Sequence, residues 1–162
     1  MPTFADYTSA REFFAAVRDA SIEADRTRRM LQRMEASEGL KGQSYAPRVA
    51  SGNRDVMQRT DARMDYEERM RERVDEDYAL MELGDQVIYG RESGKGGIDA
   101  LLGSAYADVV WWRTCGAATW HEVAERVGYT RRYCMEMYGV AMDAVDAYGF
   151  EACADGVGSA QD

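Results

Sequence analysis

Hydrophobic residues in the first forty positions recur at alternating steps of four and three, with charged residues between them. Ser9, followed by Glu12 three residues later, is the pattern that caps the start of a helix, and Gly39 is a typical helix end. The repeat predicts a helix that packs against another helix along one stripe. Alanine and threonine make this stripe thin. Its members are Phe13, Val17, Ala20, Ala24, Thr27, Leu31 and Met34.

A second, longer helix is predicted from Arg54 to about Tyr89, because this stretch has no proline and no glycine before Gly84. Such a helix is about 50 Å long, too long for one small domain to cover. We expect it to pair with the first helix or with a second copy of the chain. The glycines and Pro47 of residues 38–53 predict a loop between the two helices. The positions expected to face the partner are Met57, Met64, Met70, Val74, Tyr78, Met81 and Ile88.

Four glycines around Lys95 interrupt the helical pattern at residues 90–97 and predict a flexible hinge. The spacing GxxxxGK[ST] of a phosphate-binding loop is absent, and no strand precedes the segment. Beyond it, residues 98–115 are predicted as one apolar helix. The expected fold is therefore all-α, with a helical hairpin or coiled coil over 1–89, a hinge, a helical domain over 98–150 and a flexible tail over 151–162.

Two short capped helices are predicted within residues 119–142. Thr119 and Thr130 are N-cap residues, and Gly128 supplies the turn between the two helices. Two helices joined in this way favour a helix-turn-helix, whose second helix takes the position that enters the major groove of DNA. The residues expected to form its core are Val123, Ala124, Val127, Cys134, Met137, Ala141 and Val145.

The same segment resembles region 4 of sigma factors of the sigma-70 class, and Arg113 stands where that family often has an arginine. In layout the whole chain is similar to the ArpU/RinA-like group of phage and prophage late-gene transcription regulators, including a loop element at residues 48–52. The resemblance implies DNA binding near promoters, contact with RNA polymerase, or both. The matching residues are Thr119, Trp120, Glu122, Val123, Ala124, Val127, Gly128, Tyr129, Thr130, Arg131, Ala141 and Met142.

A DNA-binding surface is predicted at the start of the second helix. We expect Arg131 and Arg132 to reach base edges in the major groove. Tyr133 would stack or contact phosphate, and Glu136 would accept a hydrogen bond from a cytosine amino group. The helix N-terminus at Thr130 favours a phosphate. The alternative is that these side chains form a solvated surface of a structural helix pair. The full set is Thr130, Arg131, Arg132, Tyr133, Met135 and Glu136.

Charge favours a second hypothesis. The 162 residues carry 20 basic and 29 acidic side chains, and residues 98–162 hold only 4 basic against 10 acidic ones. This balance argues against non-specific nucleic-acid binding by the whole molecule. Tyr133, Met135 and Val140 stand where sigma-like recognition helices usually carry basic side chains. The alternative function is a protein-interaction module that docks on RNA polymerase or another phage protein with little DNA contact.

The remaining chemistry is sparse. Three cysteines do not suggest a disulfide framework, and His121 with Cys115 and Cys134 lacks the spacing of a metal site. We expect no cofactor, no metal and no enzymatic activity. No run of about 20 apolar residues and no signal pattern occur, so we expect a cytoplasmic protein without a membrane partner.

Two further expectations concern surfaces. Adjacent Trp111 and Trp112 cannot point the same way, so one of them is expected to be exposed, while most of the aromatic cluster with Trp120 is core. The thin stripe of the first helix and the length of the second predict self-association through residues 9–89.

Overall fold

A computed structural model describes residues 1–41, 53–92 and 94–156. Over these residues the regular structure is entirely helical, which confirms the predicted all-α class. The loop element at 48–52 and the tail residues 157–162 lie outside the described ranges. No described helix combines the length and the apolar character that crossing a bilayer requires. The elements are η1 (Phe4–Asp6), α1 (Ala10–Lys41), α2 (Asn53–Tyr89), α3 (Gly97–Leu102), α4 (Ser104–Arg113), α5 (Trp120–Val127), α6 (Arg131–Tyr148) and α7 (Phe150–Asp155).

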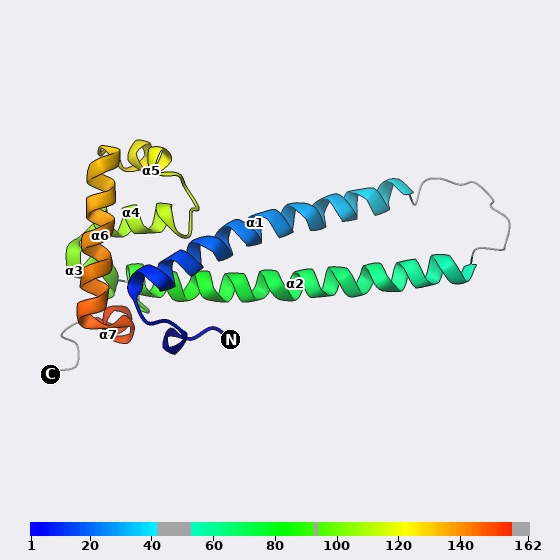
Figure 1. Cartoon of the computed structure of the whole chain (residues 1–162), viewed down its shortest axis with the longest axis horizontal. Coiled ribbons are helices and arrows are strands. Elements are labelled where there is room, and N and C mark those ends of the chain that lie inside the picture. Colours follow the sequence, from blue (N-terminus) through cyan, green and yellow to red (C-terminus); the bar gives the residue numbers. More distant parts are fainter. Residues whose placement is uncertain (42–52, 93, 157–162) are drawn as a thin grey trace.

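The two long helices, α1 and α2, lie side by side and antiparallel, and the shorter helices gather at one end of the pair (Figure 1). α1 begins close to the predicted residue. The Ser9 hydroxyl accepts a hydrogen bond from the Glu12 amide at 3.2 Å. The Glu12 carboxylate does not return to Ser9 and instead accepts from the amide and the hydroxyl of Thr8, at 3.0 and 2.6 Å. The Ser9 half of the predicted capping box is thus present, and the hydrogen bond to the Glu12 carboxylate comes from Thr8, one residue earlier than predicted.

The stripe predicted on α1 is the face that packs on α2, because its members from Phe13 to Thr27 are buried. The prediction for α2 is wrong at three positions. Met57, Met64 and Tyr78 have 64%, 63% and 43% of their surface exposed. The face of α2 that turns inward includes charged residues that a hydrophobic pattern misses. Its buried or half-buried positions, at steps of three and four, are Arg63, Glu67, Met70, Val74, Asp77, Met81, Gly84 and Ile88.

Charged groups in this contact face meet partners across the two helices. The guanidinium of Arg63 donates to the Met34 carbonyl of α1 at 2.9 Å. Further along, Asp77 faces Glu23 of α1, and Arg73 Nε lies 3.5 Å from Glu23 Oε1. Burial first, and then the neighbouring Glu23 carboxylate, raise the pKa of Asp77 to about 6. Two carboxyls therefore share one arginine inside the contact between α1 and α2.

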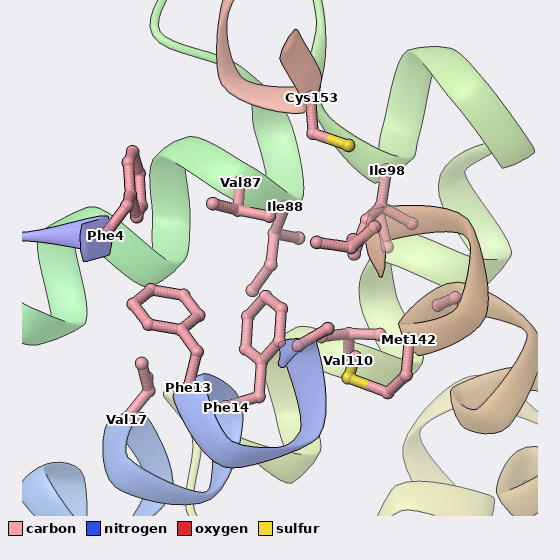
Figure 2. Close-up of a cluster of buried hydrophobic side chains, with 14 residues drawn as sticks. Phe4, Phe13, Phe14, Val17, Val87, Ile88, Ile98, Val110, Met142 and Cys153 are labelled. Atoms are coloured by element: carbon pink, nitrogen blue, oxygen red, sulfur yellow. The ribbon is translucent and has the colours of Figure 1, made fainter. Parts of the chain in front are cut away.

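The main core lies where the long pair meets the short helices (Figure 2). Phe13 and Phe14 of α1 enter it with ring centroids 5.0 Å apart. Residues from both sides of the segment 90–97 meet there, so residues 1–89 and 98–150 contribute to one core. Its labelled members in Figure 2 are Phe4, Phe13, Phe14, Val17, Val87, Ile88, Ile98, Val110, Met142 and Cys153.

The Gly-rich segment is a tight turn in which backbone packs on backbone. A Cβ at Gly97 would lie 2.5 Å from the Gly90 nitrogen and 2.5 Å from the Ile88 oxygen, so only glycine permits this approach. The single helix predicted over 98–115 is wrong. The chain breaks at Gly103, where φ is 102°, a value that an α-helix cannot contain, and it forms α3 and α4 instead.

The tail predicted from residue 151 is helical through Asp155, which corrects that expectation. Cys153 and Ala154 of α7 are buried, and Cys153 packs in the main core. This hydrophobic contact holds α7 against the rest of the fold. Arg91 adds two salt bridges to α7, one to Glu151 and one to Asp155.

The raised pKa of Asp77 generates a prediction for Asp77→Asn. The folded protein binds this proton more tightly than the unfolded chain, so the wild type loses stability as pH rises from about 4 through about 6. Asparagine does not titrate and does not lose stability in this way. The free energy of unfolding of the variant, relative to that of the wild type, should therefore increase as pH rises through this window. Urea unfolding between pH 4 and 8 measures the difference, with Asp75→Asn, an exposed neighbour, as the control. A difference that stays constant with pH would contradict the assignment.

Candidate nucleic-acid interface

Helices α4, α5 and α6 pack around a second, smaller core. Val123 of α5 and Cys134 of α6 are fully buried in it, and Val109 supplies the contact from α4. Of the predicted core residues, Val123, Cys134 and Met137 are buried here, with Ala124 and Val127 half-buried beside them, whereas Ala141 and Val145 are buried in the main core. The small core fixes how α5 and α6 sit against α4.

The turn between α5 and α6 follows the local rules that predicted it. Thr119 Oγ1 accepts from the Glu122 amide at 3.3 Å, and Thr130 Oγ1 accepts from the Tyr133 amide at 3.2 Å. Gly128 ends α5 with φ 80° and ψ 20°, the left-handed conformation that favours glycine. Both predicted N-caps are confirmed, and the beginning of α6 is placed at Arg131.

The six predicted site residues are all exposed at the N-terminal end of α6, and we call them the α6 N-terminal surface: Thr130, Arg131, Arg132, Tyr133, Met135 and Glu136. Helical spacing places Arg131 beside Met135 and Arg132 beside Glu136, in two adjoining rows of the helix surface. Tyr133 lies on another flank, where its ring meets that of Tyr129 at a centroid distance of 5.2 Å. Four of the six side chains thus lie in two adjoining i,i+4 pairs, and the pair of Arg132 with Glu136 is in contact.

The two arginines of this surface differ in their contacts. Arg132 Nε lies 3.4 Å from Glu136 Oε1, with 91% and 60% of the two side chains exposed. Arg131 makes no ion pair with any residue that the structure describes. Because an exposed pair at this spacing contributes only a few tenths of a kcal/mol, about 0.3–0.5, Arg132 can exchange Glu136 for another anion at low cost.

Both adjacent tryptophans are half-buried, so the expectation that one is exposed is wrong. Trp111 packs against the main core and Trp112 against the smaller one, with ring centroids 5.0 Å apart. Guanidinium groups cover two of the aromatic faces: Arg126 lies 5.0 Å from the Trp112 ring centroid, and Arg113 lies 4.6 Å from that of Trp120. The cluster is structural, as the sequence predicts for most of it.

Side chains of α1 hold the turn between α4 and α5, a contact that the sequence does not predict. Arg18 Nη1 donates to the carbonyls of Arg113 and Ala118, at 2.6 and 2.8 Å. Ser21 Oγ donates to the Cys115 carbonyl at 2.6 Å. The turn contains Ala117 with φ 51°, which a residue other than glycine rarely adopts. Hydrogen bonds from α1 thus satisfy the carbonyls of a turn whose backbone is strained.

α6 in turn supports α1. The Ala10 amide, at the first residue of α1, donates to Asp146 Oδ1 at 2.7 Å, and Arg11 Nη1 lies 2.9 Å from Asp143 Oδ1. A carboxylate at a helix N-terminus is favourable both as a hydrogen-bond acceptor and against the helix dipole. The contacts of α1 with the α4–α5 turn and with α6 fix the long pair relative to the α6 N-terminal surface.

His121 and Cys134 do not come together in the structure. His121 Nε2 lies 3.1 Å from Glu125 Oε1 at the surface, whereas Cys134 is buried in the smaller core. Burial raises the pKa of Cys115 to about 11 and raises that of Cys134, which keeps both as thiols. In the described part of the chain, no group of three His, Cys, Asp or Glu side chains is placed to hold a metal ion.

No family model matches the chain, and neither a curated protein nor a solved structure matches it.

The hydrogen bonds of Arg18 generate a stability prediction. Arg18→Ala leaves the Arg113 carbonyl without this donor and the Ala118 carbonyl with only the 3.1 Å hydrogen bond from Arg113 Nη1, and it should lower the free energy of unfolding by about 1–3 kcal/mol. Amide hydrogen exchange of residues 114–118 should accelerate more than that of the α1–α2 pair. Arg26→Ala, which removes an exposed arginine of the same helix, is the matched control and should stay within about 0.5 kcal/mol of the wild type. Equal effects of the two substitutions would contradict the assigned role.

Proposed function

We propose that this chain is a DNA-binding transcription regulator of phage or prophage type, that it is not an enzyme, and that it reads duplex DNA with the N-terminal end of α6 in a helix-turn-helix. The observation that carries the proposal is the α6 N-terminal surface. It is a capped helix start held by a small core, with Arg131 in no ion pair among the described residues and Arg132 almost fully exposed. The resemblance of residues 119–142 to sigma region 4 supports the same reading.

Each residue of the surface has a chemical role in this proposal. Arg131 and Arg132 offer the forked donors that match O6 and N7 of guanine. Glu136 accepts from a cytosine amino group. Met135 offers an apolar contact to a thymine methyl group. Near Thr130, the free amides of the first turn of α6 and the positive end of the helix dipole bind a phosphate, and the Tyr133 hydroxyl can donate to another.

The excess of acidic side chains in residues 98–162 disfavours DNA binding less than the count suggests, because many of these carboxylates are paired with other residues of the fold. Asp146 caps α1, Asp143 pairs with Arg11, and Asp108 accepts from the Tyr89 hydroxyl at 2.8 Å. Glu151 and Asp155 both bind Arg91. These five carboxylates lie on α4, on the C-terminal half of α6 and on α7, and none belongs to the α6 N-terminal surface.

The test is the double variant Arg131→Ala/Arg132→Ala. A duplex of about 40 base pairs, selected by the wild-type chain from a random library, is titrated by fluorescence anisotropy at several salt concentrations. Each arginine that binds a base contributes about 1–3 kcal/mol, so affinity should fall by at least tenfold and base preference should relax. Arg59→Ala/Arg69→Ala, which removes two exposed charges of α2, is the control. An affinity and a salt slope equal to those of the wild type would overturn the assigned surface.

A specific observation also favours the alternative, a module that docks on RNA polymerase or another phage protein. Tyr133, Met135 and Val140 of α6 have 43%, 48% and 47% of their surface exposed, and apolar exposure of this kind suits a protein partner. This hypothesis predicts that the tagged chain co-purifies with RNA polymerase when the two are mixed near equal concentration, and that Met135→Glu/Val140→Glu abolishes the capture. Absence of a complex in the wild-type mixture would count against polymerase docking.

A further inference from the structure

The face of α1 opposite its contact with α2 carries a row of arginines. Val17, Ala20 and the other members of the buried stripe face α2, and helical spacing places Arg18 and Ile22 on the opposite side. Farther along that side lie Arg26, Arg29 and Arg33, and we call these three residues the arginine row. All three are exposed, and the Arg29 side chain is 67% exposed.

This face of α1 points to the side of the molecule that holds the candidate DNA-binding helices. Arg18, on the same face, donates its two hydrogen bonds to the α4–α5 turn. Arg29 follows Arg18 by eleven residues, which is about three helical turns, so the two side chains project in nearly the same direction. Figure 1 shows that the side of α1 turned away from α2 is the side on which α5 and the N-terminal end of α6 lie.

The α1–α2 pair is electrically polarised across its width. From Arg26 to Met34, α1 carries four arginines and no acidic residue. Asp25 Oδ2 lies 2.9 Å from Arg29, whereas Arg26 and Arg33 form no ion pair within the described ranges. Helical spacing puts a set of carboxylates on the opposite outer face, that of α2, and all of them are exposed: Asp61, Asp65, Glu68, Glu72, Asp75 and Glu76.

We propose that the arginine row binds backbone phosphates of the same duplex that α6 reads, on the flank of the reading site; this rests on the function proposed above. Arg29 and Arg33 lie about 16 to 22 Å beyond Arg18 along α1, at 1.5 Å per residue. That distance corresponds to roughly 5 to 7 base pairs of duplex, at roughly 3.4 Å per pair. Guanidinium groups match phosphate oxygens in a forked geometry.

Duplex DNA fits this surface better than other anionic partners. A duplex is a long rod with uniform negative charge, so one that rests on the α6 N-terminal surface continues past it on both sides. The arginine row stands on the side that such a rod would occupy, while the carboxylates of α2 face away from it. A net charge of -9 is thereby compatible with DNA binding, because much of the acid lies on the far face.

The experiment compares the triple variant Arg26→Gln/Arg29→Gln/Arg33→Gln with the wild type on two selected duplexes. One of about 8 base pairs extends only about 4 pairs to either side of the centre of the α6 site and stops short of the arginine row, and one of about 40 extends past it on both sides. On the long duplex the slope of log affinity against log salt should fall by about 2 to 3, since each lost phosphate contact removes about 0.9. On the short duplex the variant should match the wild type.

The matched control is Arg59→Gln/Arg69→Gln/Lys95→Gln, which removes the same charge from exposed residues outside the outer face of α1. Circular dichroism checks that all variants keep their helix content, and single Arg29→Gln, with an expected slope change of about 1, replaces the triple variant if that one does not fold.

The possible outcomes distinguish a failure of this proposal from a failure of the proposed DNA-binding function. If the wild type binds no duplex, both fail. If the wild type binds both duplexes and loses affinity with Arg131→Ala/Arg132→Ala, but the triple variant and its control have equal slopes, only the role of the arginine row is overturned. Light scattering identifies a different occupant: a triple variant that loses self-association with an unchanged slope would assign the row to the acidic α2 face of a second copy.

Discussion

The insertion of the first turns of α1 into the main core is the interaction on which the rest of the structure depends. Phe13 and Phe14 are fully buried and contact residues of the C-terminal helices as well as the end of α2. A pair of helices joined only along a thin stripe of alanine and threonine buries little apolar surface. The two phenylalanine rings add the buried apolar surface that the stripe lacks. They also fix the direction in which the α1–α2 pair extends from the main core. The hydrogen bonds of Arg18 and the cap from Asp146 act on helices that this core has already brought together.

Much of the helical pattern was predictable because it is local. Helix starts at Thr119 and Thr130 depend on groups within three residues, and the stripe of α1 is a simple repeat. The contact face of α2 was only partly predictable from hydrophobicity, because Arg63 and Asp77 occupy it together with the predicted apolar residues, while Met57 and Met64 do not. Their placement depends on which residues of α1 lie opposite. The order in α7 likewise comes from a core formed by residues far away in sequence.

The candidate site likewise has features that the sequence predicts and contacts that it does not. Exposure of the α6 N-terminal surface follows from the cap and from the apolar face of α6, both visible in the sequence. The contacts that orient this surface relative to α1 join residues about a hundred positions apart, and no local signal marks Arg18 or Ser21 among the other polar residues of α1. Charge counts by segment also mislead, because they do not say on which face of a helix each charge lies. Once the faces are known, the arginine row on the outer face of α1 is separate from the carboxylates on the outer face of α2.

The composition of the main core has a consequence for the order of folding. Phe4 and Phe13 meet Phe150 in that core, with ring centroids 5.4 and 5.0 Å apart, so its first and last members are separated by most of the chain. Contacts of such high sequence separation form late and slowly, whereas α1 and α2 need only each other to begin pairing. During synthesis the chain therefore carries an incomplete core, in which Phe4 and Phe13 lack their contact with Phe150, until α7 has left the ribosome.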